Sequence, residues 1–292
     1  MKNITIIGAT GTLGLPITKK LNSLGVQVKA VVRDIQKAKE ILPDSVEVVY
    51  GDVANKESLK VALIGSKTVY LNLNTTTWNV DAPFHVEREG IINVIDVSKE
   101  LGIQHIMQIV GIDSSHPEFA TTGMEYKTNL IRKPAMEYLK NSGINYTFFH
   151  CSVFLDSFPS FIQEQEFAII GNHSYPVYFT NTTQLAGNIF NAIDNEEAHN
   201  KAFTIQGKEG VSFPEAAKKF VGIYNSDIKV MEYPLDIIPH LGLPTKEDEQ
   251  FMEHMLTYVE QLKEEQVSQK TWEILGEPEL SIDDFAKTIV GR

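Results

Sequence analysis

The sequence of 292 residues predicts an α/β fold in which helices cover both faces of a doubly wound parallel sheet. Three observations support this prediction. Apolar, β-branched segments alternate with segments of helical composition, as they do in consecutive βαβ units. A cluster of glycines separates the first expected strand from the first expected helix. After about residue 154 the alternation becomes irregular, which indicates a smaller C-terminal α+β lobe.

The regular part of the pattern gives the elements of the sheet in chain order. We expect strands at residues 3–7, 26–32, 46–50, 67–73, 104–111 and 145–151. We expect helices near 12–24, 34–42, 55–64, 84–101 and 124–142. A helix at 182–193 and a strand at 202–206 follow after an irregular segment. The larger domain should therefore cover 1–152 and 180–207, and the lobe 153–179 and 208–292.

Three glycines follow the first strand directly, each three residues from the next. The first permits a tight turn, the second lets the backbone approach a pyrophosphate, and the third lets the helix pack closely on the strand. A diphosphate would then lie against free N–H groups at the positive end of the helix. The alternative is an ordinary turn between a strand and a helix. The pattern predicts a Rossmann domain that binds a dinucleotide through Gly8, Thr10, Gly11, Thr12, Leu13 and Gly14.

The second strand ends in Arg33-Asp34, which bears on the choice between NADP(H) and NAD(H). A carboxylate at this strand end would bind the adenosine ribose and repel a 2′-phosphate, whereas a guanidinium would attract the phosphate. Lys37 follows four residues after Arg33 on the next helix, so both cations can face the same point. We therefore favour NADP(H). The alternatives are a solvated helix start and a ribose contact from Asp34.

Two further strand ends carry residues that can reach a bound dinucleotide. Asp52 and Val53 follow the third strand, and we expect them beside the adenine. The alternative is that Asp52 caps the helix that comes next. Asn72 and Asn74 end the fourth strand, at the sheet edge where ligands of such folds bind. Asparagine is also a common turn residue, so a purely structural role is the alternative there.

Composition and charge exclude several function classes. The net charge is −12 and the isoelectric point is near 5.2, without the clustered Lys and Arg that a nucleic-acid surface needs. The one cysteine, Cys151, precludes an intrachain disulfide and indicates a reducing compartment. Signal-peptide, membrane-span and metal-ligand patterns are absent, so we expect a cytoplasmic protein without metal or membrane partner. We expect a monomer or homodimer with a small-molecule substrate or a regulated protein partner.

Four segments carry a family resemblance. They are the glycine motif Gly8–Gly14, Val32-Arg33, Gly51-Asp52 and, most specifically, the junction Glu137–Thr147 between a helix and the sixth strand. Together they resemble the NmrA-like branch of the atypical short-chain dehydrogenases/reductases. The resemblance implies a Rossmann core with a small C-terminal substrate lobe. It leaves the activity open, because members include NADPH-dependent quinone and phenylpropanoid reductases and regulators that bind dinucleotide without known turnover.

The catalytic motif of typical short-chain dehydrogenases is absent. In that motif, Tyr-x-x-x-Lys, the lysine lowers the phenol pKa and holds the nicotinamide ribose, but none of the ten tyrosines here has Lys four residues later. The resemblance puts Arg132 where related reductases carry a lysine, and an arginine can hold oxygens but cannot release a proton. It puts Gly111 where a catalytic Ser or Thr often stands. Tyr126 is a candidate proton donor, with packing on the sheet as the alternative.

These observations predict an NADPH-dependent reductase of small, apolar acceptors of the quinone or enone type, in which the cofactor supplies the hydride. The alternative is a protein that senses the ratio of NADP(H) to NAD(H) and acts through a partner. An epimerase of nucleoside-diphosphate sugars fits less well, because it needs the missing tyrosine base. An enclosed apolar pocket would favour the reductase. We expect its lining to include Phe154, Phe158, Phe161, Tyr178 and Phe179.

An acidic helix expected at 247–266 carries an apolar stripe. Such a stripe usually packs against the core of the protein or against a second copy of the chain. Its members are Phe251, Met255, Tyr258 and Leu262.

Overall fold

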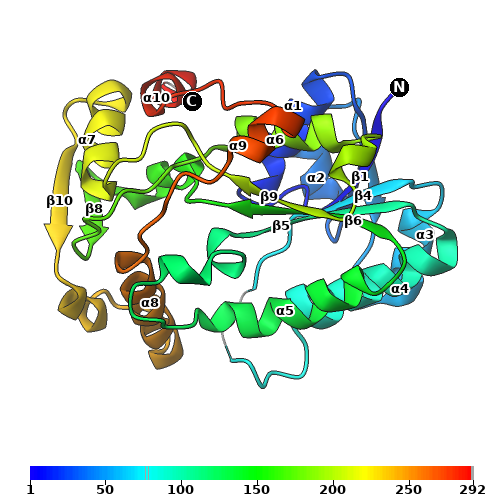
Figure 1. The fold of residues 1–292 in the computed structure, drawn as a ribbon, viewed down its shortest axis with the longest axis horizontal. Helices are drawn as coiled ribbons and strands as arrows, with labels where there is room; N and C mark the ends of the chain where they lie inside the picture. Colours follow the sequence, from blue (N-terminus) through cyan, green and yellow to red (C-terminus); the bar gives the residue numbers. More distant parts are fainter. Residues whose placement is uncertain (76, 78, 291–292) are drawn as a thin grey trace.

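The computed structural model describes residues 1–75, 77 and 79–290. Its centre is a sheet of seven strands in the order β3-β2-β1-β4-β5-β6-β9, with every neighbouring pair parallel (Figure 1). The first six strands lie where the sequence predicts them, and the seventh is the strand expected near 202–206. Their bounds are β1 (Asn3–Ile7), β2 (Gln27–Val32), β3 (Glu47–Tyr50), β4 (Thr68–Leu71), β5 (His105–Gly111), β6 (Asn145–Cys151) and β9 (Lys201–Ile205).

Helices cover both faces of this sheet, which confirms the predicted fold class (Figure 1). One face packs against α1 (Gly14–Ser23), α2 (Ile35–Ile41), α6 (Thr182–Ala192) and α9 (Gln269–Leu275). The other face packs against α3 (Lys56–Leu63), α4 (Ile91–Leu101) and α5 (Lys127–Lys140). Because both faces are buried, strands such as β4 and β5 are buried along nearly their whole length rather than at every second residue. The strand order reverses between β1 and β4, which is where such sheets bind ligands.

Residues after β6 build a second, smaller sheet in the order β10-β8-β7. Its strands are β7 (Ile162–Gln163), β8 (Glu166–Ile170) and β10 (Lys229–Tyr233). Two packed helices, α7 (Phe213–Tyr224) and α10 (Ile282–Ile289), join it around an aromatic core that contains the buried Phe158, Phe167 and Phe220. The helix α8 (Lys246–Glu260) lies beside the N-terminal end of α5, where the Lys127 amide donates a hydrogen bond to His254 Nε2 at 3.1 Å (Figure 1). After α8 the chain returns to the large sheet, where α9 packs against α6 and β9. The helix α9 lies within the range 208–292 that was expected to belong to the lobe.

Two short helical turns, one before α4 and one after β5, position the site. A single turn of π-helix, Val86–Gly90, leads into α4, and a 3₁₀ turn, Ile112–Ser114, follows β5. Such irregular turns are frequent next to functional sites. None of the described helices is long and apolar enough to cross a bilayer.

Candidate active site and cofactor site

The glycine motif forms the turn from β1 to α1. Gly8 has a φ of +92°, a conformation that L side chains rarely adopt, and a Cβ atom there would overlap the carbonyl oxygen of Asn72. A Cβ atom at Gly14 would overlap the carbonyl oxygen of Gly8. The fold itself therefore requires glycine at both positions.

Gly11 differs from the other two, because no described part of the chain requires a glycine there. A Cβ atom at Gly11 would meet only the carbonyl oxygen of Gly8, at an ordinary contact distance of 3.5 Å, and its φ lies outside the left-handed region. Gly11 and Thr12 are exposed, and α1 begins after Leu13 without a side chain that caps its N–H groups. The open surface over Gly11 and the uncapped helix end fit the pyrophosphate of a dinucleotide.

The end of β2 presents two cations and an engaged carboxylate. Asp34 is the N-cap of α2 and accepts a hydrogen bond from the Lys37 amide at 3.0 Å. Arg33 and Lys37 are exposed, and neither side chain forms a hydrogen bond or ion pair with a described residue. One oxygen of the Asp34 carboxylate thus stabilises the helix end, while both cations remain available to a phosphate.

Asp52 and Val53 lie in different environments at the end of β3. Asp52 is half-buried, and its Oδ1 accepts a hydrogen bond from the Ala54 amide at 2.9 Å. The cap of α3 is Asn55 rather than Asp52, because Asn55 Oδ1 accepts from the Ser58 amide at 3.1 Å. The Val53 side chain is buried. A contact of either residue with adenine stays a prediction.

Asn72 lies beside the glycine turn, as expected from its place at the end of β4. Its Nδ2 is within 3.1 Å of the position that a Cβ atom at Gly14 would take, and its Oδ1 accepts a hydrogen bond from the Tyr70 hydroxyl at 3.2 Å. Asn74 is exposed on the segment that follows. The structure therefore brings Asn72, but not Asn74, into contact with the predicted dinucleotide loop.

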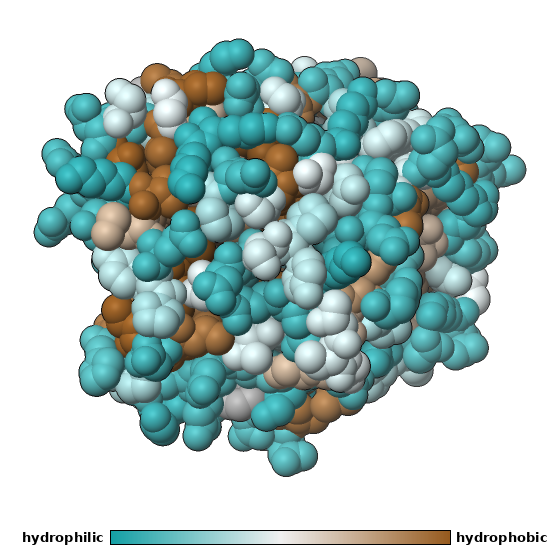
Figure 2. Space-filling model, turned by 60° about the vertical axis from the view of Figure 1, so that its left-hand side comes forward, coloured by the Kyte–Doolittle hydropathy of each residue, from teal (hydrophilic) through white to brown (hydrophobic). Residues whose placement is uncertain are grey.

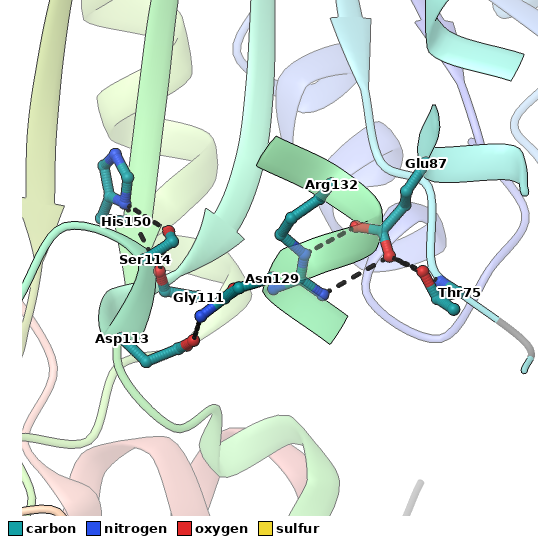
Figure 3. A network of polar contacts seen from close by, with 8 residues as sticks. All are labelled: Thr75, Glu87, Gly111, Asp113, Ser114, Asn129, Arg132 and His150. Carbon is teal, nitrogen blue, oxygen red and sulfur yellow. Dashed lines mark hydrogen bonds and ion pairs between the residues drawn. The ribbon is translucent and has the colours of Figure 1, made fainter. Parts of the chain in front are cut away.

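Asp113 lies at the end of β5, on the 3₁₀ turn, and is 9% exposed. Asn129 on α5 donates a hydrogen bond to Asp113 Oδ2 (Figure 3). A Cβ atom at Gly111 would overlap Asp113 Oδ1, so glycine is needed for the carboxyl group to lie here. Burial raises the pKa of Asp113, although the Arg132 charge and the Asn129 hydrogen bond act in the opposite direction.

A second set of contacts holds the turn that carries Asp113. Ser114 Oγ donates to the Gly111 carbonyl at 2.6 Å and lies 2.9 Å from Nδ1 of His150 on β6 (Figure 3). Burial lowers the pKa of His150 to about 4, so the ring is neutral at pH 7. These uncharged hydrogen bonds fix the turn against the neighbouring strand.

Arg132 is buried on α5 and is paired within the protein. Its Nε lies 3.4 Å from Glu87 Oε1, and its Nη2 donates to Glu87 Oε2 at 3.4 Å (Figure 3). Glu87, on the π-helical turn, also accepts hydrogen bonds from the Thr75 amide, at 2.8 Å, and from the Thr75 hydroxyl. The predicted contact of Arg132 with cofactor oxygens would therefore have to share or displace Glu87.

Tyr126 is the residue before α5 and is half-buried against α8. Its ring stacks on Tyr258, with centroids 5.0 Å apart, and on His254 at 5.6 Å. Burial raises the pKa of Tyr126 to about 12, against a lowering by the Arg132 charge. The phenol therefore stays protonated at neutral pH, and its packing on α8 was not expected from the sequence.

A cavity of about 870 Å³ opens between the ends of β5 and β6, the smaller sheet and α8. Figure 2 brings this end of the molecule forward and shows hydrophobic residues gathered among hydrophilic ones. Most of the lining is apolar, as with Ile112, Ile170 and Leu241. Of the described residues that line the cavity, none is Lys or Arg, and the acidic ones are Asp113, Glu166 and Glu264. The cavity therefore suits an apolar molecule that carries no negative charge.

The predicted lining was wrong for four of its five aromatic residues. Phe161 lines the cavity, whereas Phe154 is packed in the core of the large sheet and Phe158 and Phe179 in that of the smaller one. Tyr178 packs over Gly210 instead. The apolar stripe of the acidic helix supplies much of the wall, through Met255, Tyr258 and Leu262.

A family model described as NAD(P)H-binding matches residues 8–166, which include both the glycine turn and Asp113. The chain belongs to this NAD(P)H-binding family. Photosystem II assembly factor Ycf39 of Cyanophora paradoxa is 26% identical over 240 residues, covering 80% of this chain and 72% of that protein.

Two solved structures share the whole fold of this NAD(P)H-binding protein. Triphenylmethane reductase of Citrobacter sp., in complex with NADP(H), has a TM-score of 0.76 and 17% identity, with 98% of this chain and 100% of that chain covered. An NADPH-dependent quinone oxidoreductase of Escherichia coli, in complex with NADPH, has a TM-score of 0.74 and 18% identity, with 98% and 99% covered. Both structures show the fold that the sequence predicts.

Two buried carboxylates at the cavity were not singled out from the sequence. Asp113 had a weak signal, since it follows the end of a buried strand by two residues. Glu264 had none, because its partners are distant in the chain: Ser152 Oγ donates to it at 2.8 Å and Gln206 Nε2 at 3.1 Å. Burial raises the pKa of Glu264, while these hydrogen bonds lower it.

Proposed function

We propose that this protein is an NADPH-dependent reductase that transfers a hydride to apolar, conjugated acceptors of the quinone or enone type. The observation that carries the proposal is the apolar cavity of about 870 Å³ at the carboxyl ends of β5 and β6. Open α/β sheets bind their substrates at these strand ends, in pockets of this size and polarity. The quinone oxidoreductase and the triphenylmethane reductase that share the fold support a reductase of conjugated molecules.

Within this proposal the preferred cofactor is NADP(H) rather than NAD(H). Arg33 and Lys37 are two exposed cations at the end of β2, and Asp34 is engaged as a helix cap. A ribose 2′-phosphate would gain charge-assisted hydrogen bonds from the cations, whereas a ribose hydroxyl would have to share the Asp34 carboxylate with the Lys37 amide.

The residues of the chain bind and orient the reactants. The backbone at Gly11 and the first N–H groups of α1 would hold the pyrophosphate. The bound cofactor supplies the hydride, which is its own chemistry. The apolar walls around Ile112 and Ile170 exclude water, so that a hydride is not lost to solvent.

The charge of the cavity argues against an epimerase of nucleoside-diphosphate sugars. Such a substrate carries an anionic diphosphate, which would need Lys, Arg or a helix N-terminus beside it. The described residues around the cavity instead include three acids, Asp113, Glu166 and Glu264, and no Lys or Arg. The tyrosine and lysine pair that would abstract the sugar proton is also absent.

A second candidate, a redox sensor that does not turn over, is favoured by one observation. Arg132 is paired with Glu87 inside the protein rather than directed to an open site. A sensor, however, has no need of an apolar substrate cavity next to its dinucleotide, so we rank it second.

Steady-state oxidation of NADPH against a panel of quinones and enals tests the proposal. We expect turnover by the parent protein. Ala168→Phe, which fills the cavity from β8, should lower kcat/KM by about tenfold or more while NADPH binds as before, because the added ring takes up space that the acceptor would occupy. The matched control is Val61→Phe on the exposed surface of α3. Normal NADPH binding without oxidation of NADPH by any acceptor would instead support the sensor.

A further inference from the structure

The end of β5 places a buried carboxyl group directly at the wall of the cavity. Asp113 lines the cavity and is 9% exposed. A Cβ atom at Gly111 would overlap Asp113 Oδ1, so the carboxyl group fills the space where a side chain at position 111 would begin. The family resemblance expects Ser or Thr at that position. In this chain the proton-bearing group beside position 111 is the Asp113 carboxyl group.

The contacts of Asp113 fix its direction without using up its proton. Asn129 donates to Oδ2, and no other described side chain donates a hydrogen bond to this carboxyl group (Figure 3). Arg132 Nη1 lies 3.5 Å from the position that a Cβ atom at Gly111 would take, on the same side of the strand end. A positive charge is thus close enough to stabilise the carboxylate after the proton has left.

We propose that Asp113 is the proton donor of the reduction. The inference rests on the proposed function, because it concerns the acceptor in the same cavity. With an enone, a hydride supplied by NADPH would form a new C–H bond at the β-carbon, the C=C electrons would become a double bond between the α-carbon and the carbonyl carbon, and the C=O electrons would move to the oxygen. That oxygen takes the carboxyl proton of Asp113, which leaves an enol, NADP⁺ and a carboxylate. A proton from the bulk solvent, relayed by water at the mouth of the cavity, would restore the carboxyl group.

The charged and titratable groups around Asp113 determine when it holds its proton. Burial raises the pKa of Asp113 above that of an ordinary aspartate, which keeps part of the population protonated closer to neutral pH. Arg132 and Lys133 on α5 oppose this rise. The neighbours from the other elements are Tyr126 before α5, Tyr258 on α8 and Glu87 on the π-helical turn.

Tyr126 is the competing donor, since it also lines the cavity. Its pKa of about 12 lies far from neutral pH, whereas a general acid works best with a pKa near the working pH. Its ring is also held between Tyr258 and His254 on α8. Asp113 is therefore the better placed and better matched acid.

The test compares Asp113→Asn with the parent protein and with Asp156→Asn. Asp156 is a half-buried carboxyl group that also has a raised pKa, but it accepts hydrogen bonds from Thr182 and is not among the described residues that line the cavity. We expect Asp113→Asn to lower kcat by about 10²–10⁴-fold, the usual contribution of a general acid, with the dissociation constant for NADPH unchanged. In the parent, kcat should fall as pH rises through the pKa of Asp113, and this fall should be absent from any residual activity of Asp113→Asn.

The outcomes separate this assignment from the proposed function. Turnover by Asp113→Asn within tenfold of the parent, with the same pH profile, would overturn the role of Asp113 and leave the reductase intact. No turnover by the parent with any acceptor would overturn the reductase and, with it, the donor that it requires. A large loss in Tyr126→Phe but not in Asp113→Asn would transfer the role to Tyr126. Circular dichroism and thermal melting of each variant show whether it is folded.

Discussion

The two strand ends that frame the site differ in how the sequence builds them. At β1, the backbone that would bind the pyrophosphate lies within seven residues, from Gly8 to Gly14, and Asn72 at the end of β4 packs against it. At β5, the polar cluster combines side chains from three segments: Asp113 after the strand, Asn129 and Arg132 on α5, and Glu87 before α4. A backbone site follows from local spacing, whereas a side-chain cluster depends on tertiary contacts.

The largest effect that tests this comparison is expected at the glycine turn. Gly11→Val should weaken dinucleotide binding by about a hundredfold or more, because the branched side chain would occupy the space left open for the pyrophosphate. The protein should stay folded, since a Cβ atom at this position has room. Titration with NADPH and circular dichroism on the same sample provide the measurement.

Gly14→Ala is the matched control, and its main loss should be in stability rather than in dinucleotide binding. Its Cβ atom would overlap the Gly8 carbonyl, so the loss should appear in the free energy of unfolding. Normal NADPH binding by Gly11→Val would mean that the phosphates are held elsewhere.

A smaller effect is expected from the side chains at the end of β2. There, cofactor preference should depend on the charge of the side chains rather than on the shape of the backbone. Arg33→Asp should weaken NADPH relative to NADH by about 2–3 kcal/mol, or roughly 30- to 150-fold, because it replaces an attraction for the 2′-phosphate with a repulsion. Calorimetric titration with both cofactors measures the difference. Lys39→Asp, the same change of charge at the exposed far end of α2, should leave the ratio near that of the parent. An equal loss for both cofactors in Arg33→Asp would show that Arg33 does not bind the 2′-phosphate.

The same contrast explains what the sequence predicts well and what it does not. The six strands, the glycine turn and the family follow from periodicity and short spacings, which are local. The cavity lining does not, because an apolar residue such as Phe158 reads the same whether it fills a core or lines a pocket. Glu264 was missed since its partners are far away in the chain. Location, oligomeric state and partner stay predictions, because the contacts of one chain do not test them.

The smallest effect is expected at the end of β5. There, the pH dependence of stability reports the protonation of Asp113 without any turnover. The pKa of Asp113 is higher in the folded protein than in the unfolded chain, so the folded protein binds more protons at pH values between the two. Asp113 therefore lowers the free energy of unfolding as pH rises through this range. Asp113→Asn removes this term. The free energy of unfolding of Asp113→Asn in urea, taken relative to that of the parent protein, should therefore be higher at pH 7.5 than at pH 4. The difference should be about 1.4 kcal/mol for each unit by which the pKa of Asp113 is raised. Asp284→Asn should show little change between these two pH values, because hydrogen bonding to Ser281 and pairing with Lys287 lower the pKa of Asp284, so that this carboxyl group titrates below pH 4. If Asp113→Asn changes stability equally at both pH values, Asp113 ionises in the folded protein as it does in the unfolded chain, and it would then be a poor proton donor near neutral pH.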